Sequence, residues 1–164
     1  MRLTEILPVR HVKLPLLSMT KTEVIAELLE VLLASGEVRD REAALTALLE
    51  REKTHTTGIG GGLALPHAKT PAVGRLVMAL GRSPGVDFES IDGKPVTLVA
   101  LLLGPLDSTD PHIQALARIS RLLSNDLLRR RIESATTPEQ IVKIIAEKEK
   151  EESAASAAAK APGP

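Results

Sequence analysis

Residues 58–68 read Gly-Ile-Gly-Gly-Gly-Leu-Ala-Leu-Pro-His-Ala, and this stretch says most about the fold. Its glycines indicate a turn in which the backbone can approach a ligand closely. The apolar segment Leu63–Leu65 follows as a short strand, and Pro66 restricts the residue before it to extended geometry. We therefore expect His67 to stand at the tip of a buried strand, beside a glycine turn.

The composition indicates one domain with an aliphatic core. The chain has 164 residues, with 21 Lys and Arg against 21 Asp and Glu, so its formal net charge is zero. Neither a basic surface nor an aromatic stacking platform for nucleic acid is expected, since the chain has one Phe, no Tyr and no Trp. The lack of cysteine excludes disulfides, thiolate nucleophiles and thiolate metal ligands.

The sequence shows no pattern typical of membrane insertion. Its first residues lack the basic region and long apolar run of a signal peptide. The longest apolar run, Val96–Leu103, is far shorter than the roughly 20 residues that span a bilayer. We expect no membrane insertion and a cytoplasmic location.

Helical and strand patterns alternate along the chain. The strand candidates are Arg75–Arg82 and the nearly all-apolar Val96–Leu103, which suits the centre of a sheet, and Met1–Leu17 could supply an edge strand. The expected helices, each opened by a capping residue, run from Thr20 to Gly36, Asp40 to Glu50, Asp110 to Leu123, Asn125 to Ile132 and Thr137 to about Lys150. The pattern predicts a single α/β domain with a mixed central β-sheet and helices on its faces.

The domain is expected to occupy residues 1–150. Residues 151–164 contain no large apolar side chain and have nothing to bury. We expect them to form a low-complexity, disordered tail.

His67 and the glycines Gly60, Gly61 and Gly62 suit phosphoryl chemistry. A phosphocarrier histidine must be neutral, exposed and fixed, with one ring nitrogen attacking phosphorus while a hydrogen bond holds the other. Backbone N–H groups of a glycine loop can close on phosphate oxygens. The alternative is a loop histidine beside glycines that only make a turn.

The stretch Glu52–Ala68 resembles the active site of the enzyme IIA domains of the phosphoenolpyruvate-dependent phosphotransferase system, in the fructose/mannitol class. The nitrogen-regulatory branch of that class is the most similar. The resemblance also covers Arg51–Lys53, Asp92–Val96 and Asp110–His112, within roughly residues 3–148. In this family a histidine carries a phosphoryl group between proteins.

The resemblance implies roles for three side chains. His67 would accept the phosphoryl group from the phosphorylated histidine-containing phosphocarrier protein, without a cofactor. Arg51 would steady the phosphoryl oxygens with its planar fork, and His112, in the first turn of a helix, would donate a hydrogen bond to them. The residues alone leave alternatives: a solvated helix-terminal cation for Arg51, and an unpartnered helix residue for His112.

The remaining histidines, His11 and His55, lack such a context and are expected to be exposed. A metal site made from His67, His112 and Asp110 is the less favoured alternative, because their spacing matches no known ligand motif. We expect no bound metal.

Two classes of function follow from the resemblance. In the first, the protein is a phosphorylation-dependent regulator of other proteins, because no IIB or membrane domain is fused to the chain. In the second, it is a sugar-uptake component that passes the phosphoryl group to a separate IIB domain. A protein-binding module that is never phosphorylated is the least favoured. The sugar, the regulated partner and the oligomeric state are not encoded in any motif.

Overall fold

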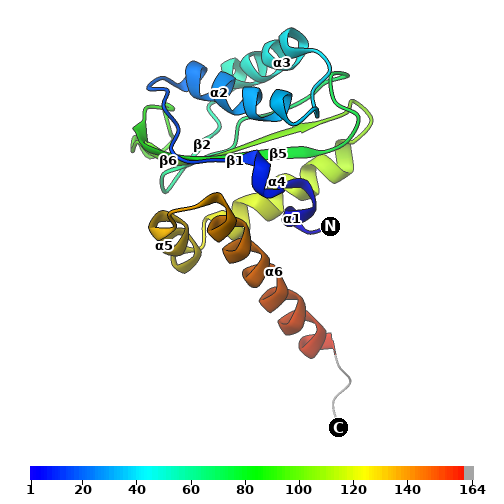
Figure 1. Cartoon of the computed structure of the whole chain (residues 1–164), viewed down its shortest axis with the longest axis vertical. Helices are drawn as coiled ribbons and strands as arrows, with labels where there is room; N and C mark the ends of the chain where they lie inside the picture. Colours follow the sequence, from blue (N-terminus) through cyan, green and yellow to red (C-terminus); the bar gives the residue numbers. More distant parts are fainter. Residues whose placement is uncertain (161–164) are drawn as a thin grey trace.

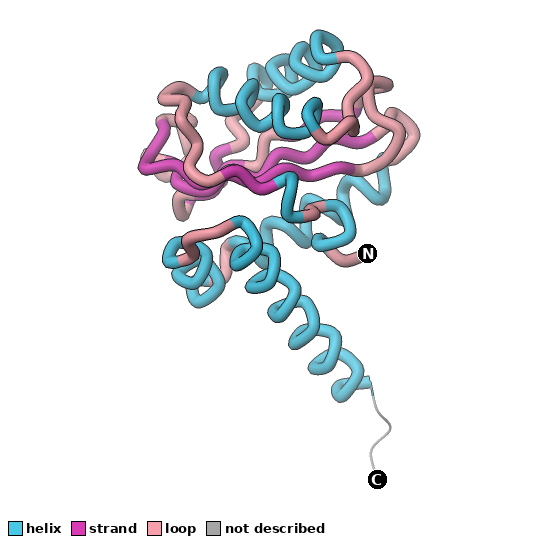
Figure 2. The backbone as a smooth tube through the Cα atoms, viewed as in Figure 1, coloured by secondary structure: helices cyan, strands magenta, loops and turns pink. Residues whose placement is uncertain are grey.

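The computed structural model describes residues 1–160 and shows one mixed sheet between two layers of helices (Figures 1 and 2). The strands are β1 (Val12–Lys13), β2 (Gly58–Gly60), β3 (Leu63–Ala64), β4 (His67–Lys69), β5 (Val77–Val86) and β6 (Val96–Gly104). The helices are α1 (Leu3–Ile6), the 3-10 helix η1 (Val9–His11), α2 (Lys21–Ala34), α3 (Arg41–Thr54), α4 (Thr109–Leu123), α5 (Asp126–Ser134) and α6 (Pro138–Lys160). The expected fold class is confirmed.

Strand β6 is the centre of the sheet. The strand order is β1-β5-β6-β3-β2, and β4 pairs with β6 beyond the end of β3. Strand β5 runs antiparallel to β6, whereas β3 and β4 run parallel to it. Leu98, Ala100 and Leu102 pack into one core cluster, and Val99 and Leu101 into the other. Side chains of β6 therefore point alternately to the two faces, which explains its apolar sequence.

The two helical layers cover opposite faces of the sheet. Helices α2 and α3 lie on one face, and α1, α4, α5 and α6 lie on the other (Figure 1). The N-terminal segment contains the short helices α1 and η1, and within Met1–Leu17 the edge strand is limited to Val12–Lys13. The sequence signal for α1 is helical spacing, since Leu3, Ile6 and Leu7 all face the core.

Helix ends follow the capping residues with one exception. Thr20, Asp40 and Asn125 accept hydrogen bonds at the starts of α2, α3 and α5, as expected. Asp110 is not the N-cap of α4, because that helix begins at Thr109 after Ser108. Helix α3 also continues past Glu50 to Thr54, which places Arg51 in its last turn.

The expectation of a disordered tail is wrong for residues 151–160. Helix α6 continues through them to Lys160 and extends away from the domain (Figure 2). Alanine has the highest helix propensity and is frequent here, and no proline or glycine interrupts the segment. Residues 161–164 of the expected tail lie outside the described residues. No helix in residues 1–160 is long and apolar enough to cross a membrane.

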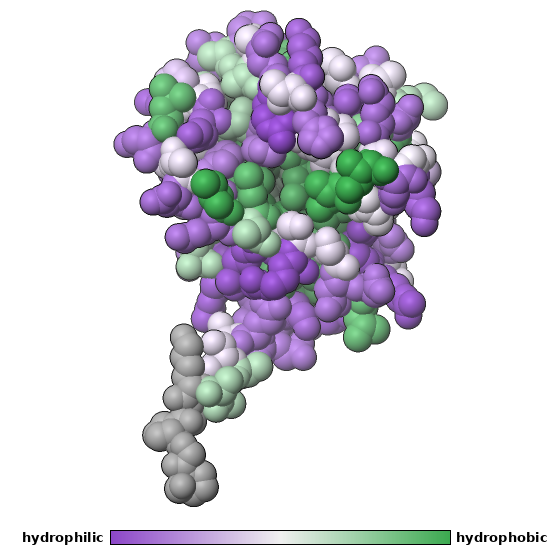
Figure 3. Space-filling view, turned by 180° about the vertical axis from the view of Figure 1, so that it is seen from behind, coloured by the Kyte–Doolittle hydropathy of each residue, from purple (hydrophilic) through white to green (hydrophobic). Residues whose placement is uncertain are grey.

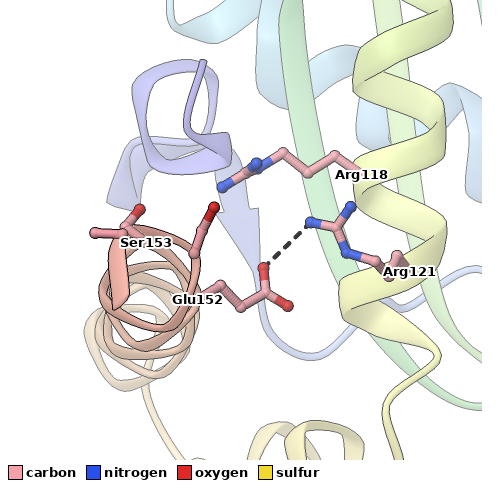
Figure 4. A pocket seen from close by; sticks show the side chains of 6 residues that line it. Arg118, Arg121, Glu152 and Ser153 are labelled. Atoms are coloured by element: carbon pink, nitrogen blue, oxygen red, sulfur yellow. Dashed lines mark hydrogen bonds and ion pairs between the residues drawn. The ribbon is translucent and has the colours of Figure 1, made fainter. Parts of the chain in front are cut away.

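Two ion pairs fasten α6 to α4. Glu149 is 1% exposed, accepts a hydrogen bond from the backbone N–H of Leu3, and pairs with Arg118 Nε at 2.9 Å. One turn further on, Glu152 pairs with Arg121 at 3.2 Å across an open pocket (Figure 4). The first pair is buried and also caps α1, so it carries more of the stability than the second.

We predict that Glu149→Ala lowers the free energy of unfolding by about 3 kcal/mol, because it leaves buried donors without an acceptor. The exposed pair provides the control: Glu152→Ala should cost less than about 1 kcal/mol. Urea unfolding followed by circular dichroism measures both. Equal losses in the two variants would contradict this ranking.

Candidate functional site

His67 begins a second short strand and does not end the first. Strand β3 stops at Ala64, Pro66 follows, and His67 pairs with Leu102 in β4. The half-buried imidazole lies with Nδ1 at 2.7 Å from the carbonyl oxygen of Leu65. A carbonyl oxygen only accepts, so Nδ1 carries the proton and Nε2 keeps a free lone pair. This arrangement suits a nucleophilic imidazole.

The structure brings His112 to His67. Their ring centroids are 5.6 Å apart, with the ring planes inclined by 52°. His112 lies in the first turn of α4, where its backbone N–H donates to the carbonyl of Ser108 at 2.8 Å. Its side chain packs over Gly104, where a Cβ atom would come within 3.0 Å of Nδ1. A glycine at the end of β6 therefore makes room for the second imidazole.

Burial keeps both imidazoles neutral. It is the main cause that lowers the pKa of His67, and the nearby Arg51 cation acts in the same direction. Glu52 and the hydrogen bond to Leu65 oppose this shift. His112 is 5% exposed, and burial, followed by the neighbouring His67 and Lys69, lowers its pKa to about 4. Nδ1 of His112 is buried and has no hydrogen-bond partner in the described part of the chain.

Arg51 lies in the last turn of α3, and this helix packs against β4, the strand that begins at His67. Its guanidinium donates to the carbonyl of His55 at 2.9 Å and contacts the hydroxyl of Thr54 at 3.3 Å. These bonds hold the side chain against the end of its own helix. The planar guanidinium carries further N–H groups of the kind that donate to the oxygens of an anion.

The structure does not bring Gly60, Gly61 and Gly62, the predicted phosphate-binding loop, to His67. Leu63 pairs with Leu98 and His67 with Leu102, so the loop and the imidazole are separated by about 13 Å along the sheet. The three glycines have φ angles of 96°, 64° and 78°, which only glycine adopts readily. They shape a tight turn.

Side chains from other elements occupy the polar groups of this turn. The N–H of Gly61 donates to Asp92 at 3.0 Å, and its carbonyl accepts from Arg129 at 2.8 Å. The parallel strand carries the chain away from the turn before His67 is reached. The glycine turn and His67 are therefore close in the sequence but lie apart along the sheet.

A buried carboxylate, for which the sequence predicted no individual role, lies next to Arg51 in the last turn of α3. Glu52 is 7% exposed, accepts the backbone N–H of Thr57 at 3.0 Å, and pairs with Lys21 at 3.2 Å. The signal was present in the sequence, because Glu52 continues the buried stripe of α3 formed by Ala44 and Leu48 at four-residue intervals.

The other histidines lie outside the site. His11 is buried and not exposed, with Nδ1 at 3.0 Å from the carbonyl of Met78 and Nε2 at 3.0 Å from the hydroxyl of Ser35. His55 is exposed. Within residues 1–160, no three side chains of His, Cys, Asp or Glu are grouped so as to hold a metal ion.

Exposed apolar side chains accompany the site. Leu106, in the turn before α4, is 62% exposed, and Ile113, in the first part of α4, is 59% exposed. Hydrophobic side chains gather across the middle of the face that is turned away in Figure 1 (Figure 3). Apolar surface beside a reactive group is typical of a protein that meets other proteins.

Comparison with known proteins identifies the family. Residues 5–148 match the family model described as "Phosphoenolpyruvate-dependent sugar phosphotransferase system, EIIA 2". The chain belongs to this family, whose members are components of the phosphotransferase system. The family supports a phosphocarrier role.

Curated relatives come from both branches of the family. The chain is 40% identical over 151 residues to the fructose-specific EIIABC component of Bacillus subtilis, covering 92% of this chain and only 24% of that protein. It is 40% identical over 129 residues to the fructose-specific EIIA component of Haloferax volcanii, covering 78% and 84%. It is 38% identical over 109 residues to a nitrogen regulatory protein of Bradyrhizobium diazoefficiens, covering 66% and 71%.

Solved structures have the same fold. The nitrogen regulatory protein IIA-Ntr of Neisseria meningitidis superposes with a TM-score of 0.77 at 29% identity, covering 87% of this chain and 98% of that one. The IIA mannitol protein of Escherichia coli superposes with a TM-score of 0.72 at 24% identity, covering 83% and 96%, which shows the fold alone.

We predict that His112 makes stability sensitive to acid. Between its ordinary pKa of 6.5 and its folded value of about 4, the unfolded chain binds a proton that the folded chain does not. The free energy of unfolding therefore falls as the pH falls through this window, by about 3 kcal/mol for this group. Urea unfolding at several pH values should give a shallower slope for His112→Gln.

The matched control is His55→Gln, which replaces an exposed histidine. It should leave the slope of stability against pH unchanged. A wild-type slope in His112→Gln would show that other groups, such as the buried His11, account for the acid sensitivity.

Proposed function

We propose that the protein is a phosphohistidine carrier that accepts a phosphoryl group on Nε2 of His67. The observation that carries this proposal is the bond from Nδ1 of His67 to the carbonyl of Leu65. Because this bond holds the proton on Nδ1, the lone pair of Nε2 points away from Leu65. Burial also lowers the pKa of the ring. The ring is thus ready to attack phosphorus without first losing a proton.

The donor in this proposal is the phosphorylated histidine-containing phosphocarrier protein of the system, in the cytoplasm. Nε2 of His67 forms a new N–P bond while the N–P bond of the donor histidine breaks. The donor ring carries a proton on its other nitrogen, so when the electron pair of that bond returns to it, the ring leaves as neutral imidazole. His67 keeps its Nδ1 proton toward Leu65, so no net proton is released.

Arg51 and His112 take the stabilising roles. The guanidinium of Arg51 offers N–H donors for the oxygens of the phosphoryl group. His112 is neutral near pH 7, and its buried Nδ1 has no acceptor, which favours the tautomer with the proton on Nε2. That N–H would donate to a phosphoryl oxygen. In-line transfer requires such positioning and charge stabilisation more than new covalent chemistry.

We propose that phosphorylation acts mainly as a switch in protein binding. The exposed Leu106 and Ile113 beside the site suit a partner shaped for the unmodified face. A phosphoryl group would place up to two negative charges at this apolar surface and weaken such contacts. The nitrogen regulatory relative from Bradyrhizobium diazoefficiens supports this branch.

The second candidate is sugar uptake, with transfer to a separate IIB domain. It is favoured by the fructose-specific relatives at 40% identity. A mannitol IIA of the same fold has been solved in complex with phosphorylated IIB from Escherichia coli. A binding module that is never phosphorylated is the least favoured reading.

We predict that His67→Ala abolishes phosphorylation, whereas His112→Ala is still phosphorylated at His67, more slowly or with a shorter-lived product. The chain is incubated with phosphoenolpyruvate and the two general proteins of the system. Intact-mass spectrometry then follows an acid-labile, base-stable gain of one phosphoryl group. A phosphoryl group on His112 in the wild-type protein would overturn this division of roles.

The switch predicts different partners for the two forms. Unmodified and phosphorylated protein are used as separate baits, with His67→Ala as a bait that cannot be phosphorylated. Partners that bind the unmodified form and His67→Ala, and are lost on phosphorylation, are the expected result. Identical partner sets, together with rapid transfer to a IIB domain, would make the protein an uptake component.

A further inference from the structure

We propose that Glu52 is a positioning residue of this site, which fixes the orientation of His67 through Thr57 and Leu65. The proposal rests on the proposed function of His67. Glu52 does not contact the reacting atoms. It acts through a continuous series of hydrogen bonds that begins in α3 and ends at the imidazole.

The first part of this series is the buried carboxylate of Glu52, both oxygens of which accept hydrogen bonds. One oxygen of Glu52 accepts the backbone N–H of Thr57 at 3.0 Å, and the other accepts the Thr57 hydroxyl at 2.5 Å. Lys21, at the start of α2, adds its ammonium at 3.2 Å. Thr57 is itself buried. An apolar residue would fill this position without the cost of desolvating a charge, so a role beyond packing is the better explanation.

The next links run through the backbone. The carbonyl of Thr57 accepts the N–H of Leu65 at 2.9 Å. The carbonyl of Leu65 accepts the Nδ1 proton of His67 at 2.7 Å. Hydrogen bonds in series polarise one another, particularly away from water. Glu52 therefore influences both where the Leu65 carbonyl lies and how strongly it holds the Nδ1 proton.

The hydrogen bonds between Glu52 and Thr57 also determine the position of Arg51. Arg51 and Glu52 are neighbours in the last turn of α3, and α3 packs against β4, which begins at His67. Fastening Glu52 to Thr57 therefore also fixes the guanidinium relative to the imidazole. One buried carboxylate aligns the nucleophile and its cationic helper.

Electrostatics give the proposal a measurable consequence. The charged and titratable groups that face His67 are Arg51 and Glu52 from α3 and His112 from α4. Burial is the largest cause of the lowered pKa of His67 and Arg51 acts in the same direction, whereas the Glu52 carboxylate raises the pKa by less than either lowers it. Removing the charge of Glu52 should therefore lower the pKa of His67 further.

The test is Glu52→Gln in the full chain, since glutamine keeps the size of the side chain. ¹⁵N NMR of the unphosphorylated protein reads the tautomer and the pKa of His67. We expect a mixture of the two tautomers and a lower pKa. Phosphorylation by the small donor phosphoramidate should be about tenfold slower, the low end of the range for partners that orient a metal-bound histidine.

Matched variants separate positioning from folding. Glu50→Gln makes the same change on the exposed side of α3, where Glu50 pairs only with Lys53, and should behave as wild type. Thr57→Val removes the hydroxyl link and should reproduce part of the effect, which Thr57→Ser should reverse. These two variants serve as the test if Glu52→Gln does not fold, and thermal unfolding identifies that case.

The outcomes distinguish this proposal from the one on which it rests. Wild-type protein that takes no phosphoryl group on His67 overturns the proposed function. Wild-type NMR signals of His67 in Glu52→Gln and Thr57→Val overturn the positioning role, even if transfer is slower. Altered signals in both variants, with wild-type signals in Glu50→Gln, support it.

Discussion

The hydrogen bond between Nδ1 of His67 and the carbonyl of Leu65 is the constraint on which the rest of the site depends. It decides which ring nitrogen carries the proton and which way the free lone pair points. Pro66 lies between the two partners, and its carbonyl accepts the N–H of Leu102, so the chain stays bound to β6 between β3 and β4. The Leu65 carbonyl accepts the Nδ1 proton of His67 within this short connection.

Strand β6 is the common reference for the parts of the site. His67 pairs with Leu102, and two residues later Gly104 provides the space in which the ring of His112 lies. After β6 the chain turns into α4. Strand β6 therefore positions His67 by pairing with β4, and it positions His112 through the helix that follows it. This is the usual advantage of building a site at the carboxyl end of a central strand.

Charge at the site is balanced by two adjacent residues of α3 that act on His67 in opposite directions. Arg51 lies in the last turn of α3, whereas its neighbour Glu52 is buried and paired with Lys21. Because burial is the largest cause of both pKa shifts, the neutral form of each imidazole is favoured, and in the proposed function the charge that meets the phosphoryl group comes from Arg51.

The sequence by itself determined the fold class, most helix starts and the central strand, because capping residues and apolar periodicity act locally. It also singled out His67, Arg51 and His112. It misplaced the glycine turn, since only the register of β3 and β4 on β6 shows that the turn and His67 lie at opposite ends of the strand pairing. The engagement of Glu52 with Thr57 and Lys21 was likewise decided by tertiary structure, because three separate elements must pack together before that carboxylate is buried and paired.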